Sequence, residues 1–468
     1  MSVLSQICLL SIITISVSQN LPRRGLGKFE EVFAWKQISY NIDGTMVLED
    51  RFSEDLTVGG RGRRYTANSN LYFNDDDGGS KDWNKRPWNA NPIEPIKSPA
   101  KINPIDEIGR FFIQYNNVPM GAERVGNRLF VTVPRRRYGI PATLSYINLS
   151  DHSRSPHLSP YPNMRDSRAL ISVYRTRADE CGRLWAVDTG AVEIPNNITY
   201  LQPPAIVVYD LNTDRLILRY QLKSSDLPAA NTATGLASIT VELRNGDCSD
   251  AFVYIPDVVS YGLIVYSLKE NDSWRHSHNY FSFTPTAGNL HVSGQNFQWN
   301  DGIFSLTLGM RGNDGCRPAY FHPMVSYQEF MVPSCELQKR SANESLFRLL
   351  GERGDNCQST MHGLHEPTNV IFFADIGRDA ISCWNVDKPL NKLNVEVLAQ
   401  DEDKISYPSD LHITGDEVWV IANKLPRFIY STLDTEQYNF FVYRAKVRDL
   451  IPGTACSPNG QNSHIFGS

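Results

Sequence analysis

Short apolar runs recur along the chain, and each is bounded by turn-forming residues. Most come in pairs: one β-rich run, a short loop containing Asp, Gly or Asn, and a second run that ends near an aromatic residue. Successive first runs start about 50 to 70 residues apart, which is typical of a repeated antiparallel sheet. The runs are Arg128–Pro134, Arg183–Gly190, Ala205–Leu211, Ala251–Asp257, Gly262–Leu268, Gly302–Gly309, Val370–Ile376, Ala380–Val386, Glu417–Asn423 and Phe428–Leu433.

This repeat predicts an all-β fold, a six-bladed β-propeller with a central channel. A lone four-stranded sheet cannot bury both of its faces, whereas sheets packed radially cover one another and leave only short edges. We expect one domain over residues 19–456 and a C-terminal tail at 457–468; two packed β-sandwiches are the alternative. Residues 61–104 are rich in Asn, Asp, Gly and Pro, which predicts a surface insertion. Glu344–Leu350 is the best short helix candidate.

The N-terminus reads as a targeting segment. Val3–Val17 is apolar and of signal-peptide length, and Ser16 and Ser18 are the small residues expected before a cut at Gln19. We therefore expect a signal peptide over residues 1–18 and a secreted, extracellular protein; a short N-terminal anchor is the alternative. No other run is long enough to predict a membrane span.

Charge, motifs and histidine positions argue against several functional classes. The charge balance is 46 Lys and Arg against 51 Asp and Glu, or −5, which argues against a dedicated nucleic-acid binder. The chain has no phosphate-binding glycine loop, no dinucleotide fingerprint and no nucleophile elbow. We expect no cofactor and no metal, because the ten histidines are scattered.

The cysteines and glycosylation sequons fit an oxidising compartment. Of the eight cysteines, Cys8 falls in the signal peptide; the seven that remain are odd in number, so at least one thiol is free or pairs between chains. No C-x-x-C motif is present, so structural disulfides are expected. Four N-x-[ST] sequons predict glycosylated surface positions at Asn148, Asn197, Asn271 and Asn343.

Several stretches carry a family resemblance. They are FVTVPRRRYGIPATLSY (Phe130–Tyr146), CGRLWAVDTG (Cys181–Gly190), DAFVYIPD (Asp250–Asp257), YFHP (Tyr320–Pro323), AISCWN (Ala380–Asn385), YPSDL (Tyr407–Leu411) and GTAC (Gly453–Cys456). By their order and spacing the chain resembles the insect yellow/major royal jelly protein family. The resemblance implies a secreted six-bladed propeller, in agreement with the repeat.

The resemblance also implies disulfide pairs. Cys181 and Cys248 occupy recurring family positions beside consecutive blades, as do Cys383 and Cys456, so Cys181–Cys248 and Cys383–Cys456 are expected. Cys316, Cys335 and Cys357 are unusual for the family. The sequence does not fix how these three cysteines pair. We expect a Cys335–Cys357 disulfide, which would leave Cys316 free.

Candidate chemistry lies at the histidines and at the strand ends. His322 and His362 are candidate acid–base residues together with Asp257, although a buried, hydrogen-bonded His322 is the plainer reading. Asp188, Asp257, Asp375 and Asn423 end inner strands and would lie at the channel mouth, unless they cap turns. His362 and His365 form H-G-L-H, a weak metal signal without an acidic partner. Arg135–Arg137 is a strand-ending triplet, read as a solvated edge rather than an anion site.

The resemblance implies a ligand. Some secreted salivary members of the family bind biogenic amines in the channel, and the corresponding segment here suggests Thr360, Phe373 and Asp375 as ligand-binding residues. Asn423 is added to them as a strand-end residue at the channel mouth. A carboxylate would pair with the ammonium and an aromatic ring would stack on the catechol. The favoured function is pigmentation or melanin chemistry through binding of a small aromatic amine or catechol-derived ligand. The alternatives are L-dopachrome isomerisation, which needs a general base, a general acid and an anion stabiliser, and a structural or nutritive role.

Overall fold

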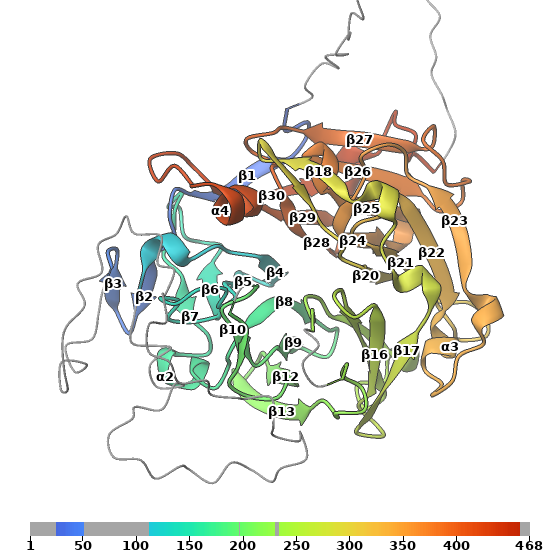
Figure 1. Cartoon of the computed structure of the whole chain (residues 1–468), viewed down its shortest axis with the longest axis horizontal. Coiled ribbons are helices and arrows are strands. Elements are labelled where there is room, and N and C mark those ends of the chain that lie inside the picture. The colour runs from blue at the N-terminus through green and yellow to red at the C-terminus, as the bar shows by residue number, and fades with distance from the viewer. Residues whose placement is uncertain (1–24, 51–111, 196, 230–233, 459–468) are drawn as a thin grey trace, which may run out of the picture.

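The computed structural model describes the chain except residues 1–24, 51–111, 196, 230–233 and 459–468 (Figure 1). The predicted signal peptide, the predicted insertion at 61–104 and almost all of the predicted C-terminal tail lie outside the described residues. The rest forms a ring of sheets.

Six four-stranded antiparallel sheets surround one axis as the blades of a propeller (Figure 1), which confirms the predicted fold. Blade 1 contains β4 (Gly121–Val125), β5 (Arg128–Thr132), β6 (Leu144–Asn148) and β7 (Ser159–Pro160); blade 2 contains β8 (Val173–Ala178), β9 (Arg183–Asp188), β12 (Ala205–Asp210) and β13 (Arg215–Gln221). Blade 3 contains β14 (Thr240–Leu243), β15 (Ala251–Asp257), β16 (Gly262–Ser267) and β17 (Asp272–Ser277); blade 4 contains β20 (Ile303–Leu308), β21 (Pro318–Pro323), β22 (Gln328–Pro333) and β23 (Arg348–Glu352). Blade 5 contains β24 (Ser359–His365), β25 (Val370–Asp375), β26 (Ala380–Asn385) and β27 (Val395–Gln400); blade 6 contains β28 (Pro408–Thr414), β29 (Glu417–Ala422), β30 (Phe440–Lys446) and β1 (Glu30–Trp35).

Short hairpins, helices and turns lie in the loops between strands and between blades. The hairpins are β2 (Tyr40–Ile42) with β3 (Thr45–Val47), β10 (Ala191–Val192) with β11 (Thr199–Tyr200), and β18 (Asn289–Val292) with β19 (Gln295–Gln298). The α-helices are α2 (Met164–Ser167), α3 (Ser334–Leu337), α4 (Leu425–Tyr430) and α5 (Val447–Leu450). The 3-10 turns are η3 (Gln114–Asn116), η4 (Arg244–Gly246), η5 (Asn279–Phe281), η6 (Pro285–Ala287), η7 (Glu344–Leu346), η8 (Glu366–Thr368) and η9 (Ile376–Arg378). None of these described helices combines the length and apolar character that a membrane span needs.

The N-terminal strand closes the ring. β1 pairs antiparallel with β30, with Trp35 opposite Phe440, so blade 6 joins both ends of the propeller domain. Trp35 is fully buried, and its indole N–H donates to the carbonyl of Pro156, 2.8 Å away. The ring is therefore held shut by a shared sheet and by buried apolar surface.

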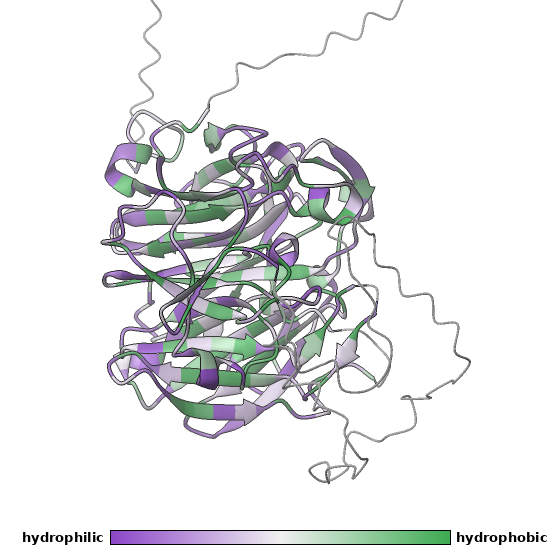
Figure 2. Cartoon of the chain, turned by 90° about the vertical axis from the view of Figure 1, so that its left-hand side faces the viewer, coloured by the Kyte–Doolittle hydropathy of each residue, from purple (hydrophilic) through white to green (hydrophobic). Residues whose placement is uncertain are grey.

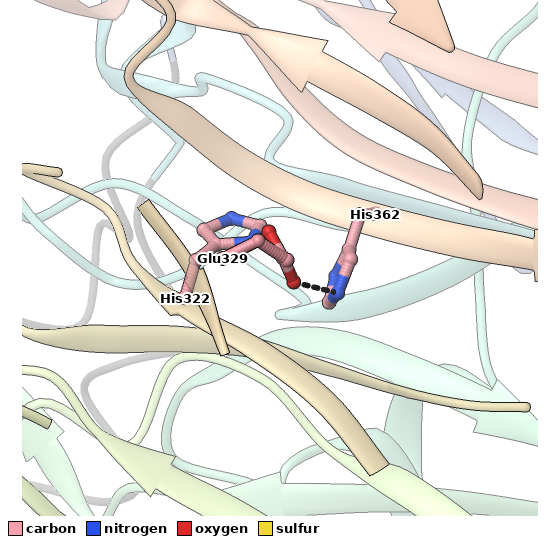
Figure 3. Close-up of side chains that lie close together, drawn as sticks. All are labelled: His322, Glu329 and His362. Carbon is pink, nitrogen blue, oxygen red and sulfur yellow. Dashed lines mark hydrogen bonds and ion pairs between the residues drawn. The ribbon is translucent and has the colours of Figure 1, made fainter. Parts of the chain in front are cut away.

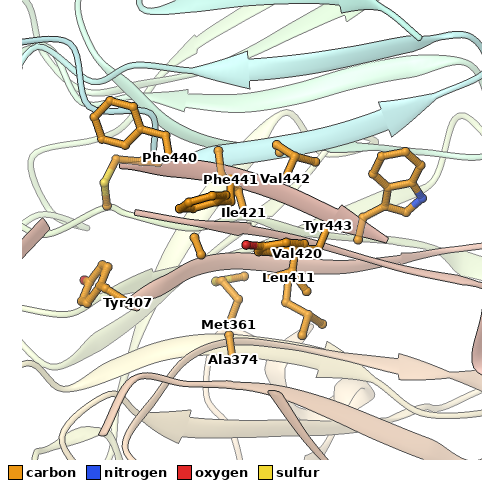
Figure 4. Packing of buried hydrophobic residues seen from close by; sticks show 14 of the residues in the cluster. Met361, Ala374, Tyr407, Leu411, Val420, Ile421, Phe440, Phe441, Val442 and Tyr443 are labelled. Carbon is orange, nitrogen blue, oxygen red and sulfur yellow. The ribbon is translucent and has the colours of Figure 1, made fainter. Parts of the chain in front are cut away.

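Hydrophobic side chains fill the spaces between neighbouring blades. One cluster joins blades 2 and 3 through residues such as Trp185 and Ile255, and the largest spans blades 5, 6 and 1. Figure 4 shows part of the latter, where Met361 and Ala374 of blade 5 face Leu411 and Val420 of blade 6. In Figure 2 the hydrophobic residues follow the strands and the hydrophilic ones gather in the loops. Both faces of each sheet are thus covered, as the propeller prediction requires.

Two local predictions are wrong. The run Phe428–Leu433 is not a strand; the chain forms α4 there, with Pro426 in its first turn, and the third strand of blade 6 comes later as β30. A proline at this position favours a helix start, and an apolar run this short does not distinguish helix from strand by its period. Glu344–Leu350 forms the turn η7 and then enters β23, so no α-helix lies there.

Three disulfides link six of the described cysteines. Cys181–Cys248 and Cys383–Cys456 are both present, as the family resemblance implied. The third pair is Cys316–Cys335, not Cys335–Cys357, and Cys357 is the buried free thiol. The reason is the register of blade 4, in which Pro318 of β21 lies opposite Pro333 of β22 and brings the two flanking cysteines together.

The four sequon asparagines are all exposed, so each is accessible to a glycosyltransferase. Their glycosylation stays a prediction. The three disulfides fit an oxidising, extracellular compartment.

Candidate functional site

The predicted strand-end residues lie together at one end of the propeller. Asp188 ends β9 opposite Val173, the first residue of the inner strand β8, and Asp375 ends β25 opposite Ser359, the first residue of β24. This end, where the inner strands begin, is called the entry end below. The residues that the sequence predicted for the channel mouth therefore do lie at one end of the fold.

Most of these side chains hold the backbone. Asp188 accepts hydrogen bonds from the backbone N–H groups of Ile171 and Ser172, 3.1 and 2.9 Å away. Asp257 accepts from the N–H of Gly235 at 2.8 Å and from Arg275 Nη1 at 3.1 Å, and also from Ser260. These contacts favour the turn-capping alternative for both carboxylates.

Asn423 is held in the same way. Its side-chain amide donates to the Pro119 carbonyl at 2.7 Å and to Ser409 Oγ at 3.1 Å, and its oxygen accepts from the Leu425 N–H. All its hydrogen-bonding groups are thus engaged inside the protein.

Asp375, Thr360 and Phe373 are buried in blade 5. Thr360 Oγ1 donates to the Pro408 carbonyl at 2.6 Å and so joins blades 5 and 6. Asp375 Oδ2 accepts from Ser382 Oγ at 2.6 Å, whereas Asp375 Oδ1 has no hydrogen-bond partner. Burial raises the pKa of the Asp375 carboxyl, and Arg378 partly opposes this.

The propeller axis is crossed by a buried arginine that the sequence did not single out. Arg175 extends from β8 of blade 2, and its Nε donates to the Ser409 carbonyl of blade 6 at 3.0 Å. Its Nη1 donates to the Ala237 carbonyl beside blade 3 at 2.6 Å, and its guanidinium lies 4.8 Å from the ring centre of Phe304 in blade 4. One side chain therefore links four blades across the expected channel.

On the entry side of Arg175 lies a second group, called the axial group below: Arg136, Tyr174, Asp301 and Tyr407. Each comes from a different blade: Arg136 from the loop after β5, Tyr174 from β8, Asp301 from the loop before β20 and Tyr407 from the position before β28. Arg136 and Asp301 are partly exposed, whereas Tyr174 and Tyr407 are buried. The group thus combines an accessible cation and carboxylate with two desolvated phenols.

The electrostatics of the axial group suit proton transfer. Burial raises the pKa of Asp301 to about 6, although the positive charge of Arg136 lowers it. Burial also raises the pKa of Tyr174, opposed by Arg136, which lies within hydrogen-bonding reach of this phenol. At neutral pH the carboxyl is then mostly an ionised base, and the phenol remains a proton donor.

Tyr407 is held in an unusual backbone conformation. Its φ is +48°, in the left-handed region that a bulky aromatic residue rarely occupies. Its N–H donates to Asp379 Oδ1 at 3.4 Å, and its ring meets Trp299 edge-on at 5.9 Å. Strain of about 1–3 kcal/mol at such a residue often marks a functional position.

The three arginines of the triplet Arg135–Arg137, beside the axial group, have different environments. Arg135 is buried, and its guanidinium donates to four backbone carbonyls, including those of Ile140 and Leu170. Arg137 lies over the ring of Phe428 at 3.9 Å. The simple reading of a solvated edge therefore fails for Arg135, and Arg136 is the member that belongs to the axial group.

The predicted acid–base residues His322 and His362 come together in a different place, between blades 4 and 5. The carboxylate of Glu329 in β22 contacts both imidazole rings (Figure 3), with Oε2 3.0 Å from His322 Nδ1 and Oε1 3.1 Å from His362 Nε2. Arg353 Nη1 donates to Glu329 Oε2 at 2.7 Å. All four side chains are fully buried. We call this set the interblade cluster.

The interblade cluster is strongly desolvated. Burial lowers the pKa of His322 to about 4, although the Glu329 carboxylate opposes this. Burial raises the pKa of Glu329, but the two histidines outweigh it and hold that pKa below its usual range. Phe373, predicted to stack on a ligand, instead stacks on His362 with ring centres 5.7 Å apart.

The sequence did not single out five of the eight residues of the axial group and the interblade cluster, for a common reason. Tyr407 lies in the YPSDL stretch and Asp301 directly precedes a predicted strand, but neither belongs to a spacing motif. Glu329 and Arg353 likewise stand in ordinary strand and loop sequence. Only the ring closure brings residues from four blades to one axis.

Known proteins are similar to this chain over most of its length. The sequence profile described as major royal jelly protein matches residues 171–456. L-dopachrome tautomerase yellow-f of Drosophila melanogaster is 45% identical over 359 residues, covering 74% of this chain and 83% of that protein. Dopaminechrome tautomerase of the same species is 37% identical over 374 residues, covering 76% and 79%. Protein yellow of Drosophila subobscura is 40% identical over 359 residues, covering 74% of this chain and 62% of that protein.

Proposed function

The chain belongs to the major royal jelly protein family, and from this premise we propose that it is a secreted protein of melanin-type pigment chemistry that tautomerises an aminochrome at its axial group. Two tautomerases of aminochromes are among its relatives, at 45% and 37% identity. The observation that carries the proposal is the meeting of Asp301 and Arg136, both partly exposed, with the buried phenols of Tyr174 and Tyr407 at the entry end; the raised pKa of Asp301, about 6, supports its role as a base.

The proposed step is a proton shift. The Asp301 carboxylate removes a proton from the ring carbon next to the iminoquinone, and the C–H electron pair enters the ring system. A phenol or solvent returns a proton to the quinone oxygen, so no oxidant or reductant is needed. Arg136 stabilises the negative charge that develops on the substrate oxygen, or pairs with a carboxylate of the substrate.

The expected pH dependence of turnover follows from the raised pKa of Asp301. A base must be ionised, so kcat/KM should fall as the pH drops below about 6, the raised pKa of Asp301. We therefore expect Asp301→Asn to lose turnover of L-dopachrome by roughly 100-fold or more, and to lose this acidic limb. Loss of the visible absorbance of L-dopachrome measures the rate, with heat-killed protein as the blank.

A matched control separates catalysis from folding. Asp403 is a highly exposed aspartate outside the axial group, so Asp403→Asn should retain wild-type turnover and pH profile. Circular dichroism and thermal midpoints confirm that both variants are folded. Wild-type turnover in a folded Asp301→Asn variant would refute the assignment of the base, and no acceleration by the wild type would refute the tautomerase itself.

Binding of a catechol-derived amine is the second candidate function. It is supported by Asp375, whose buried Oδ1 lacks a hydrogen-bond partner and is able to accept one from an ammonium. Dopamine should then quench tryptophan fluorescence saturably, without product, and Asp375→Asn should weaken this binding. An unchanged affinity in Asp375→Asn would count against that residue, and no saturable quenching would count against amine binding.

A further inference from the structure

The interblade cluster places three metal-ligand side chains around one point. One ligand atom from each of His322, Glu329 and His362 lies within 4.8 Å of the others. Glu329 Oε1 and His362 Nε2 lie 3.1 Å apart. Ligands of a tetrahedral zinc ion lie about 2.0–2.2 Å from the metal, and so about 3.4 Å from one another. A small outward movement of the side chains would create that spacing.

Two of these ligand atoms lack hydrogen-bond partners. Glu329 Oε1 and His362 Nε2 are buried and lie 3.1 Å apart as an ion pair, but neither atom makes a hydrogen bond. Glu329 Oε2 is already occupied by Arg353 Nη1, which fixes the carboxylate and leaves Oε1 directed at the imidazole. Buried polar atoms in native proteins are nearly always paired, so two acceptor atoms that face each other here need a cation or a proton between them.

The outer hydrogen bonds of both rings orient their lone pairs inward. His322 Nε2 faces the carbonyl oxygens of Ser359 and Thr360, each 3.2 Å away, so that nitrogen must carry the proton. In the neutral ring, Nδ1 then directs its lone pair at Glu329 Oε2, 3.0 Å away, which is repulsive unless a proton or a metal cation lies between the carboxylate and the ring. Metal-bound histidines have this arrangement, with the outer N–H bonded to a carbonyl or carboxylate.

His362 is supported in the same manner. Its Nδ1 lies 2.6 Å from Ser305 Oγ, and the hydroxyl also accepts the backbone N–H of His362 at 3.1 Å. When Nδ1 donates to this hydroxyl, the lone pair of Nε2 points at Glu329 Oε1. Ser305 thus acts as a positioning residue for the second imidazole.

We propose that the interblade cluster is a structural site for a divalent metal ion of the zinc class, bound by His322 Nδ1, His362 Nε2 and Glu329 Oε1. Imidazole and carboxylate ligands suit zinc, and with three protein ligands the fourth tetrahedral position would be filled by a water molecule. Because all three side chains are buried, a substrate cannot reach the ion, and its role would be structural. The ion would cross-link β21, β22 and β24, and so would tie blade 4 to blade 5. The sequence alone predicted no metal, because Glu329 stands in no spacing motif with either histidine.

The test measures metal in the full-length secreted protein without a polyhistidine tag. Protein is produced in zinc-supplemented medium, washed with a chelator and analysed for metal by mass spectrometry. We expect one ion per chain to survive the wash, because the ligands have no exposed surface. Protein produced with cobalt should show the visible absorption bands of tetrahedral Co²⁺.

Variants identify the ligands. His362→Gln should abolish the retained ion, and Ser305→Ala should lower metal affinity roughly 10- to 100-fold while keeping all three ligands. His276→Gln is the matched control, because His276 is also buried but lies in blade 3 and hydrogen-bonds the Leu337 carbonyl. Its metal content should equal that of the wild type.

The wild-type measurement alone is decisive if a variant fails to fold. Metal well below one ion per chain after the wash would overturn the proposal and leave a proton on His322 as the occupant of the gap. Equal metal retention by wild type and folded His362→Gln would also overturn it, because the ion would then lie elsewhere.

Discussion

Arg175 gives the sharpest prediction about stability, because a single side chain connects four blades at the axis. We expect Arg175→Met to destabilise the protein by about 3 kcal/mol. Methionine retains much of the apolar volume of the stem but provides no donor. The Ser409 and Ala237 carbonyls, now bonded at 3.0 and 2.6 Å, lose their charged partner.

The magnitude follows from these contacts. A buried carbonyl left unpaired costs about 1–3 kcal/mol, and two are left here. The contact of the guanidinium with Phe304 adds up to about 2 kcal/mol. Part of this loss is offset, because the variant no longer bears the desolvation penalty of a buried guanidinium. Asp410 also keeps its ion pair with Arg177 at 2.8 Å, so no buried carboxylate is left unpaired. The expected loss in the free energy of unfolding is therefore smaller than the sum of these separate contributions.

Urea unfolding followed by tryptophan fluorescence measures the effect. The control is Arg154→Met, since the Arg154–Glu31 ion pair at 2.6 Å is half-exposed and should contribute less than about 1 kcal/mol. Arg175→Lys should fall between the two, because an ammonium lacks the planar fork that reaches both carbonyls. If Arg175→Met unfolds within error of Arg154→Met, the side chain does not hold the axis together.

Three further measurements test the other conclusions. The Cys383–Cys456 disulfide spans 73 residues and Cys316–Cys335 spans 19. Chain entropy therefore predicts that replacing both cysteines of a pair by alanine lowers the free energy of unfolding by about 4.4 kcal/mol for the first pair and about 3.2 kcal/mol for the second. A larger loss for the shorter loop, measured by urea unfolding, would contradict that account. Burial raises the pKa of Asp379 to about 7, so its contribution to stability is present at low pH and lost as the pH rises through 7; Asp379→Asn should therefore raise the thermal midpoint at pH 7.5 but not at pH 4, and an equal gain at both would exclude this cause. Cys357 is buried and its thiol pKa is raised to about 11, so a thiol reagent should modify it only after unfolding; rapid labelling of the native protein would show that this region opens.

The sequence predicted the central strands of the blades well and the outer strands poorly. Runs such as Ala251–Asp257 and Val370–Ile376 are buried on both faces, so they appear as continuous apolar stretches. The outer strand β13 (Arg215–Gln221) is largely exposed and carries no comparable run. Phe428–Leu433 shows the limit of the method, because six apolar-rich residues fit a short helix as well as a strand.

The candidate sites show the same division. Sequence reasoning selected His322 and His362, which do meet, but it did not find Glu329, which lies between them. It also selected carboxylates at the entry end that hold backbone N–H groups, while Asp301 and Tyr407 escaped notice. The turn chemistry of Asp and Asn is visible in a sequence, whereas the direction of a side chain relative to the axis is not.

The sequence by itself determined the repeat, the number of blades and the family, because apolar runs and motif spacing are properties of the linear chain. Through the family resemblance it also implied two of the disulfide pairs. The tertiary structure alone decided that blade 6 takes its outer strand from the N-terminus, that Arg175 crosses the axis, and which residues form the axial group and the interblade cluster. The physical reason is ring closure. It brings together residues hundreds of positions apart, and their burial and charge then depend on neighbours that no local pattern encodes.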